Sequence, residues 1–434
     1  MKHGFRALAI LIIALLVLPG FSKAQNQVKN KKSKKQGKKI EQYFHEKGAP
    51  SDEDHVPGVS EWNHGIYFWK SKDGAFWGRF DTRVFINGAY FFENKNKLSN
   101  GTHLRKGRLA FKVNLWRVWY VEWDMDMAEG VVEAKDMFLS YHGFNNAYLR
   151  FGHFKMPFGL NILTSSRFIP FAERAYNALA FKMGRRLAIE YGRWSDTWNF
   201  RGAIYGQGFD TNKNKTKDET GGGIAARFAT APVQTKSTIL HAGISAVWTN
   251  PDDQTDVVSF DAEPETKIGD VEILDTDYIR NVNYTTRLGL EGAAVYRNFH
   301  VQSEYNLVHV KRLHHLQDAN FSAWYVYLLW DITGESRSWD KTQGEFHQLL
   351  PKDNHKGAWE VGFRFSHLDL SDTKALILGG RANNYTLGLN WYPNPNIVFQ
   401  LDGTYVMTSP NATGNGFVGN DRFAYVQFMT KFFF

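Results

Sequence analysis

The 434-residue chain contains no cysteine, so it can form neither disulfides nor thiolate metal sites, and it has no cysteine to which a lipid could be attached. Beyond its first 24 residues it also has no apolar run of the roughly 20 residues that a membrane-spanning helix needs. Any passage of this part of the chain through a membrane would therefore require strands.

Most of the chain also lacks an excess of either charge. The formal net charge is +8, but residues 1–54 hold 11 of the 52 cationic residues and only five of the 44 acidic ones, which leaves 41 against 39 from His55 onward. The lysine-dense stretch could contact nucleic acid or lipid headgroups, but such runs are typical of solvated, disordered segments. We expect no nucleic-acid partner.

Signatures of enzymes and metal sites are missing as well. The sequence has no GxSxG, HExxH or phosphate-binding Walker motif, and no cysteine nucleophile. The doublet His314-His315 does not complete a coordination sphere by itself. Asp124, Asp126 and Glu129 lack the ligand spacing of a calcium loop. We therefore expect no catalysis, no cofactor and no metal.

The N-terminus has the features of a secretory signal peptide. Lys2 and Arg6 precede an apolar stretch that ends at Leu18, and the small residues Ser22 and Ala24 fit a cleavage site. A transmembrane anchor is the alternative, but the apolar stretch is too short for it. We expect a signal peptide over residues 1–24, a flexible lysine-rich segment over 25–74 and one membrane domain over 75–434.

Aromatic residues, at 15% of the chain, occur in segments of alternating polarity. In "GRFDTRVFINGAYFF", Phe80, Val84 and Ile86 fall on one parity, and Arg79 and Asp81 fall on the other. A period of two places the two sets on opposite faces of a strand. One face suits lipid and the other suits water, which is typical of a transmembrane β-barrel.

About sixteen such segments follow one another, which predicts an all-β fold, an antiparallel transmembrane barrel, although fourteen or eighteen strands fit nearly as well. The predicted strands are 75–92, 103–115, 118–128, 132–142, 146–155, 185–193, 196–206, 220–230, 237–249, 284–296, 298–310, 320–332, 356–368, 383–392, 395–407 and 421–434.

The connections alternate between short turns and longer loops, which predicts a periplasmic and an external end. Two of them break the pattern. The long, partly apolar connection 156–184 is expected to fold into the lumen as a constriction. Residues 333–355 fall at the short-turn end, so we expect this connection either to fold inward too or to hide a further hairpin.

The sequence ends in "VQFMTKFFF", in which Val426, Phe428 and Phe434 share one parity while Gln427 and Lys431 share the other. This pattern predicts a closing strand with a terminal aromatic residue at the membrane interface. A soluble β-sandwich with a buried last strand is the alternative, and it would not explain sixteen strands with an outward apolar band.

Charged residues on the lumen parity are the candidates for a solute path. Arginine offers a planar fork of donors that matches phosphate or carboxylate oxygens. These arginines could equally pair with lumen carboxylates, and the residues leave both readings open. The basic candidates are Arg79, Arg83, Arg108, Lys112, Arg150, Arg186, Arg201, Arg227, Arg287 and Arg364; the acidic ones are Asp81, Glu122, Asp124, Asp126, Asp136, Glu190, Glu291, Glu304, Glu360 and Asp402.

Several blocks resemble one known family. The segments "LRFGHFKMPFGLNILTSSRF", "GAWEVGFRFSHLDL" and above all "GGRANNYTLGLNWYPNPN" are similar, in order and spacing, to the phosphate-selective porin O and P family, from about residue 78 to the end. The resemblance implies a sixteen-stranded channel in the outer membrane of a Gram-negative bacterium, usually a homotrimer, with loops folded into its lumen. It also implies that Lys155, in "GHFKMPFG", is a constriction residue.

Together these patterns predict an outer-membrane porin for passive diffusion of small anions, with phosphate or polyphosphate as the first candidates. The near-neutral body argues for a weakly selective general porin as the alternative, because focusing an anion requires a positive field. An outer-membrane enzyme or adhesin is a more distant possibility. The predicted solute-binding residues are Lys155, Arg79, Arg83, Arg108, Lys112, Arg150, Arg186, Arg201 and Arg227.

Overall fold

The computed structural model describes residues 61–63, 66–128, 130–209, 221–251, 256–269 and 271–434. The predicted signal peptide and most of the lysine-rich segment, residues 1–60, lie outside these ranges.

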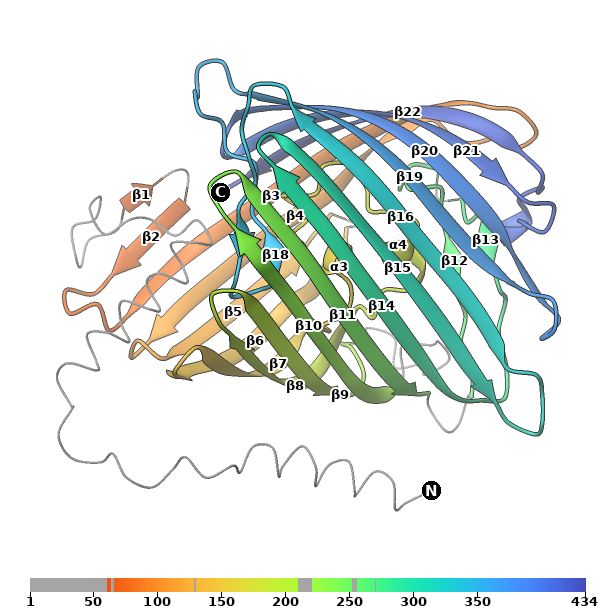
Figure 1. Ribbon diagram of the computed structural model, residues 1–434, viewed down its shortest axis with the longest axis horizontal. Helices are drawn as coiled ribbons and strands as arrows, with labels where there is room; N and C mark the ends of the chain where they lie inside the picture. Colours follow the sequence, from red (N-terminus) through yellow and green to blue (C-terminus); the bar gives the residue numbers. More distant parts are fainter. Residues whose placement is uncertain (1–60, 64–65, 129, 210–220, 252–255, 270) are drawn as a thin grey trace.

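Sixteen antiparallel strands form a closed barrel (Figure 1). Each strand pairs with the next one along the chain, and the last returns to the first, with Phe432 opposite Val84. All sixteen predicted segments are strands, which confirms the all-β transmembrane barrel. The barrel strands are β3 (Trp77–Phe92), β4 (Gly101–Leu115), β5 (Trp119–Asp126), β6 (Glu133–Phe144), β7 (Ala147–Lys155), β8 (Arg185–Trp194), β9 (Trp198–Tyr205), β10 (Gly222–Gln234), β11 (Thr238–Asn250), β14 (Val282–Tyr296), β15 (Phe299–Arg312), β16 (Ala319–Asp331), β19 (Ala358–Asp372), β20 (Ile377–Asn394), β21 (Ile397–Thr408) and β22 (Arg422–Phe433).

The alternation of polarity along each strand sets which side chains face outward. On β3 the outward Phe80 is 49% exposed, whereas Asp81 beside it is 1% exposed. On β22 the corresponding values are 45% for Phe428 and 1% for Gln427. The outward aromatic and aliphatic side chains therefore form the surface that meets lipid, and the polar side chains are enclosed.

The sheet begins earlier than the sequence predicts. The segment up to residue 74 was expected to be flexible, but β1 (Glu61–Asn63) pairs with β2 (Ile66–Lys70), and β2 pairs with the start of β3. Phe68 of β2 packs against Trp77, with ring centroids 5.9 Å apart. Sheet structure therefore begins before the expected boundary at residue 75, because the four consecutive apolar residues of "IYFW" lack the alternation of polarity that marks the other strands.

The two ends of the barrel differ in the length of their connections. Six short turns lie at the end where the C-terminal residue is anchored, since Phe434 exchanges backbone hydrogen bonds with Thr82 at 3.1 and 3.3 Å. Short turns mark the periplasmic end of such barrels. The opposite, external end carries the longer loops, including one with the single-turn helix η3 (Gly414–Gly416).

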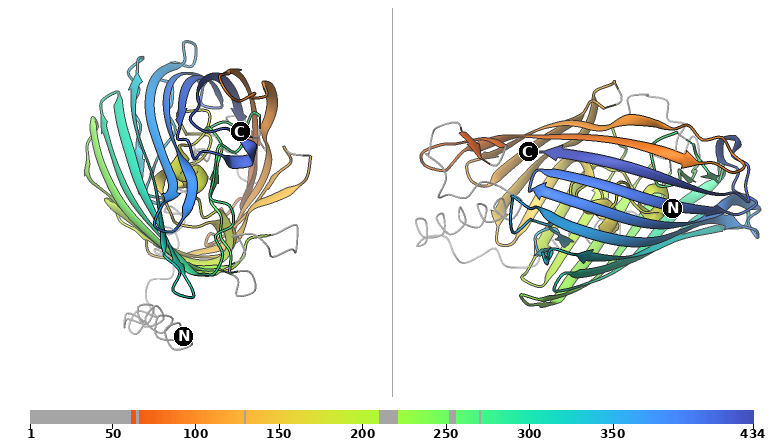
Figure 2. Two further views of the ribbon diagram at one scale, coloured as in Figure 1. Left: turned by 90° about the vertical axis from the view of Figure 1, so that its right-hand side faces the viewer. Right: turned by 90° about the horizontal axis from the view of Figure 1, so that it is seen from above.

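Three connections enter the lumen, as the view along the barrel in Figure 2 shows. The first is residues 156–184, called the inward loop below, which holds helices α3 (Leu160–Leu163) and α4 (Tyr176–Ala180). The second is residues 332–357 from the periplasmic end, called the inward hairpin, with β17 (Trp339–Asp340) paired to β18 (Glu345–Phe346). The first insertion was predicted, and for the second an inward course was one of the two alternatives left open.

The third inward connection was missed. The described part of residues 251–281 contains β12 (Asp261–Ala262) paired to β13 (Leu274–Asp275) and packs against α4 and the lumen side of β15 and β16. Its buried apolar residues, such as Val258 and Phe260, could have indicated this, because an external loop has no core in which to bury them.

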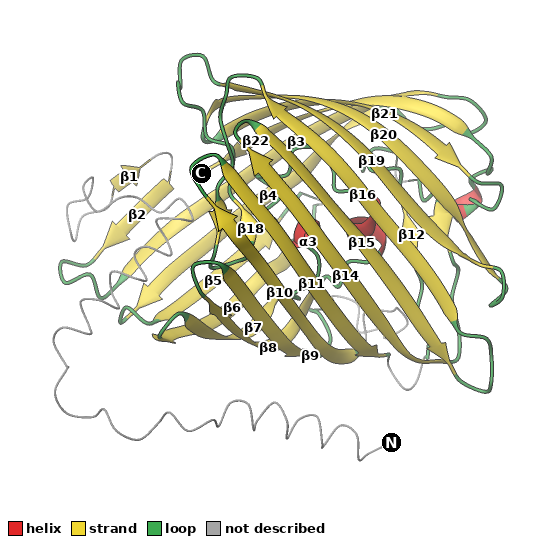
Figure 3. Ribbon diagram, in the orientation of Figure 1, coloured by secondary structure: helices red, strands yellow, loops and turns green. Residues whose placement is uncertain are grey.

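Helices α3 and α4 lie inside the ring of strands, as their red ribbons in Figure 3 show. No helix in the described ranges is long and apolar enough to cross a membrane.

Gly152 on β7 offers a test of the barrel wall. Its φ is +133°, and a Cβ atom there would lie 2.3 Å from the Met137 carbonyl oxygen. Gly152→Ala should therefore lower barrel stability by roughly 1–3 kcal/mol. Gly403→Ala on β21 is the matched control, because no atom lies within 4 Å of its Cβ position. The temperature at which half of the folded band is lost on detergent gels measures this difference in stability. Equal midpoint temperatures for the two variants would contradict the prediction.

Candidate functional site

A cavity of about 480 Å³ lies in the lumen between the inward loop and the wall formed mainly by β3 to β8. Its lining is strongly cationic, with fifteen lysine and arginine side chains against four carboxylates. The cations are Arg79, Arg83, Arg105, Lys106, Arg108, Lys112, Lys135, Arg150, Lys155, Arg167, Arg174, Lys182, Arg185, Arg201 and Lys267; the carboxylates are Glu122, Asp136, Glu173 and Glu345.

An irregularity in β4 brings two adjacent cations to the cavity. Phe85 pairs with Lys106 and Ile86 pairs with Leu104, so Arg105 is an extra residue in the ladder. Such a bulge interrupts the alternation of side chains. Both Arg105 and Lys106 therefore line the lumen, although strict alternation would put them on opposite faces.

Most cations of the barrel wall are paired with carboxylates. Asp81 accepts from both Arg79 and Lys112 at 2.8 Å. Arg108 contacts Asp126 at 2.7 Å. Glu190 lies 3.3 Å from Arg150 and 3.0 Å from Arg201. The internal-pairing reading is thus correct for these residues.

Five lining cations have no carboxylate within 4.0 Å among the described residues: Lys106, Lys155, Arg167, Arg174 and Lys182. We call them the unpaired cations. Lys155 donates to the Ile162 carbonyl at 2.6 Å, and Arg174 donates to the Thr164 carbonyl at 2.7 Å. Both donors are therefore bound by carbonyl oxygens, which carry only partial charge, and not by a carboxylate of their own.

The surroundings of the two arginines on the inward loop lower the pKa values of both side chains. Burial, together with the nearby Arg83, lowers the pKa of Arg167 to about 9. Burial also lowers the pKa of Arg174 to about 10, although Glu173 opposes the shift. Both side chains remain protonated at neutral pH, and an anion in the cavity would compensate their charge.

Seven of the nine predicted site residues line this cavity: Arg79, Arg83, Arg108, Lys112, Arg150, Lys155 and Arg201. The other two do not. Arg186 donates to the Met183 carbonyl at 3.1 Å. Arg227 contacts both oxygens of Glu291, at 2.8 and 2.7 Å, and donates to the Gly344 carbonyl at 2.8 Å, so it anchors the inward hairpin.

Sequence periodicity missed several cavity residues for two reasons. Arg105 and Lys106 lie at the bulge, where the period of two fails. Arg167, Arg174 and Lys182 lie outside any strand. The available signal was the charge of residues 156–184, where Glu173 is the only acidic residue among several cations.

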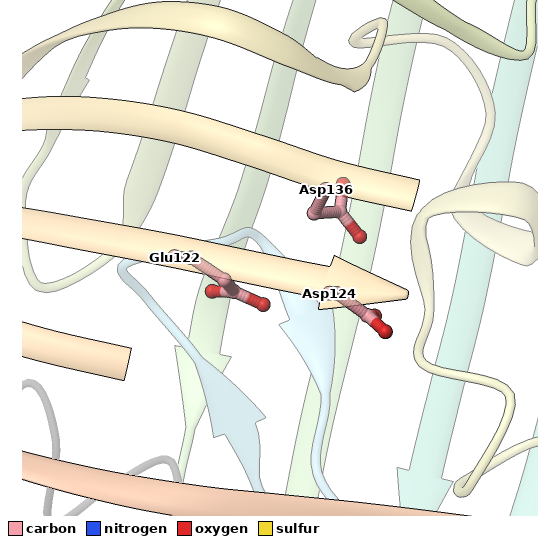
Figure 4. A group of neighbouring side chains, drawn as sticks. All are labelled: Glu122, Asp124 and Asp136. Atoms are coloured by element: carbon pink, nitrogen blue, oxygen red, sulfur yellow. The ribbon is translucent and has the colours of Figure 1, made fainter. Parts of the chain in front are cut away.

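Three lumen carboxylates form a tight group, shown in Figure 4. Glu122 and Asp124 on β5 and Asp136 on β6 bring oxygen atoms within 4.8 Å of one another. Each already has a cation nearby: Lys112 at 3.7 Å, Arg108 at 3.5 Å and Arg185 at 2.8 Å, respectively. Each carboxylate of the group therefore has a side-chain cation as a partner.

Comparison with known proteins shows to which family the chain belongs. The model of the family described as phosphate-selective porin O and P matches residues 79–432. The chain belongs to this porin family. It is 23% identical to Porin O of Pseudomonas aeruginosa over 382 residues, which cover 77% of this chain and 83% of Porin O. The protein is thus an outer-membrane porin of a Gram-negative bacterium.

Solved structures share the fold of this porin at low sequence identity. OmpT of Vibrio cholerae aligns with a TM-score of 0.53 and 10% identity, covering 83% of this chain and 98% of that one. An anion-selective porin from Comamonas acidovorans aligns with a TM-score of 0.52 and 11% identity, covering 83% and 100%. The channel DcaP of Acinetobacter baumannii gives 0.51 and 11%, covering 84% and 99%.

Glu173 allows a test of how charge in the cavity sets ion preference. Its side chain pairs with Arg105 at the cavity surface. Glu173→Gln removes one negative charge and keeps an oxygen acceptor, so it should shift the reversal potential in a potassium chloride gradient toward chloride. Asp318→Asn, which breaks the Lys311–Asp318 pair at an external loop, is the control and should leave the potential unchanged. A shift toward potassium in Glu173→Gln would contradict this assignment.

Proposed function

We propose that this porin passes small anions by passive diffusion, that the cationic cavity is its selective step, and that phosphate or polyphosphate is its first candidate solute. The observation that carries the proposal is the lining of fifteen cations against four carboxylates, five of the cations being unpaired. The family description and the anion-selective porin among the solved structures point in the same direction.

Two properties of the cavity favour anion passage. A concentration of one charge between low-dielectric walls attracts counter-ions and raises their local concentration. Cations on the wall and on the inward loop then offer successive partners, and conduction requires that each of them binds weakly enough to release the ion to the next. Arg167 and Arg174 supply forked donors suited to phosphate oxygens, and the amino groups of Lys106 and Lys155 supply further donors.

The size of the cavity is compatible with more than one phosphate group. About 480 Å³ falls within the roughly 300–1,000 Å³ of typical small-molecule sites. A short polyphosphate chain could therefore contact wall and loop cations together.

The alternative, a general diffusion pore, is favoured by the wall pairs around Asp81 and Glu190. If those pairs dominated the field, chloride, phosphate and small neutral solutes would pass alike. We infer a channel and not an enzyme or adhesin, because the titratable groups around the cavity serve ion pairs and loop anchoring.

Phosphate block of the chloride current tests the proposal. We expect low phosphate to reduce chloride conductance across a planar bilayer. Lys155→Ala and Arg167→Ala should each require about tenfold more phosphate, since each removes one charged donor. Lys236→Ala, in an exposed periplasmic turn, is the matched loss of a lysine away from the cavity and should change nothing.

The result that would overturn the proposal is a reversal potential near zero with no phosphate block in the unaltered protein. That outcome would establish the general porin. Absence of any conductance after correct refolding would instead favour an enzyme or adhesin.

We further propose a homotrimer. A V. cholerae OmpT structure described as a trimer form aligns with this porin at a TM-score of 0.52 and 9% identity. Packing of strand faces would cover part of the outward aromatic surface. Native mass spectrometry in detergent should give three chains per particle, and a monomer at all detergent concentrations would contradict it.

A further inference from the structure

The inward loop is held in place by carboxylates that accept its backbone N–H groups. Glu304 on β15 accepts from Leu160 and Asn161 at 2.9 and 2.6 Å. Asp402 on β21 accepts from Ala172 at 2.8 Å. All of these groups are buried, so each hydrogen bond is shielded from water.

Side chains of the wall also donate to carbonyl groups of the same loop. Asn390 donates to the Pro170 carbonyl at 2.6 Å, and Arg364 donates to the Glu173 carbonyl at 2.8 Å. Lys431 donates to the carbonyls of Ser166 and Ile169, both at 3.2 Å. The loop is therefore tied to the barrel through its backbone, which leaves Arg167 and Arg174 directed into the cavity.

Glu304 differs from most other lumen carboxylates because no cationic side chain lies within 4.0 Å of it among the described residues. Its third hydrogen bond comes from the Tyr325 hydroxyl at 2.7 Å. It is 1% exposed and is not part of the cavity lining. Its carboxyl oxygens thus accept from three donors, two of them on the inward loop.

The backbone of the loop is adapted to this contact. Gly159, directly before the two N–H donors, has a φ of +74°, and a Cβ atom there would lie 3.1 Å from the Glu304 Oε2 atom. A side chain at this position would be strained and would crowd the carboxylate. Glycine therefore permits the close approach of loop and wall.

We propose that Glu304 is a positioning residue for anion selectivity: it fixes the start of the inward loop so that Arg167 and Arg174 remain in the conduction path. This inference rests on the proposed anion function of the cavity. Glu304 is not part of the cavity lining and acts on the two arginines only through the loop backbone.

Replacing the Glu304 carboxyl group by an amide tests this positioning role. Glu304→Gln keeps the shape but presents an NH2 group to one of the two loop N–H donors, which cannot form a hydrogen bond. Asp402→Asn is the matched control. Only one Asp402 oxygen accepts from the loop, and its Oδ1 has no hydrogen-bond partner in the described part of the chain, so an asparagine oxygen can keep the bond to Ala172.

Single-channel recording in potassium chloride is the first measurement. Glu304→Gln should show increased open-channel noise and, in the phosphate assay, about tenfold weaker block, because a mobile loop no longer holds its arginines in place. Asp402→Asn should match the unaltered protein in both. Quiet channels with full block in Glu304→Gln would overturn the inference.

The noise measurement separates this inference from the proposed function. Noise in chloride alone reports loop mobility, so it remains informative even if phosphate binds nowhere. Lost block in Arg167→Ala with normal block and noise in Glu304→Gln would reject the positioning role alone. Should Glu304→Gln fail to insert, Tyr325→Phe keeps both loop N–H bonds but removes the third donor to Glu304, together with the oxygen that accepts from Gln302. It should raise the noise to a smaller extent, and unchanged noise there would reject the role.

Discussion

Closure of the sheet is the constraint on which the rest of this structure depends. In lipid every backbone N–H and C=O group must be satisfied within the protein, and an open sheet edge cannot be. The pairing of β22 with β3 removes both edges of the barrel. This explains why the chain ends in a phenylalanine-rich strand: the outward phenylalanines meet lipid, while Lys431 between them is fully enclosed and bonded to the inward loop.

Inside the closed barrel, cationic and acidic side chains are distributed unevenly. From His55 onward the chain has nearly equal numbers of cations and carboxylates, yet the cavity has fifteen against four. Several other lumen carboxylates have partners away from the cavity lining. Glu291 pairs with Arg227, Glu360 pairs with Arg337, and Glu304 and Asp402 bind loop backbone. A near-neutral composition is therefore compatible with a strongly positive passage, because a local field depends on where charges lie and not on their sum.

The inward connections turn a wide barrel into a selective one. The inward hairpin is fastened through Arg227 and the inward loop through Glu304, both by contacts between side chains and backbone carbonyl or N–H groups. Such contacts are independent of the loop's own side chains. The loops are thus free to present cations to the lumen while their main chain is held by the wall, which is how a loop on a rigid scaffold commonly carries function.

The sequence alone determined an all-β barrel of about sixteen strands, its outward face and the expected inward course of residues 156–184, because a period of two and the absence of long apolar runs depend only on local order. It also placed Lys155 and six arginines or lysines of the wall correctly in the lumen. Only the tertiary structure decided which lumen cations line the cavity, since Arg201, which lines it, and Arg227, which anchors the inward hairpin, look alike in a strand pattern. The bulge at Arg105 and the loop positions of Arg167 and Arg174 were equally out of reach, because pairing and loop placement arise from contacts between residues far apart in the chain.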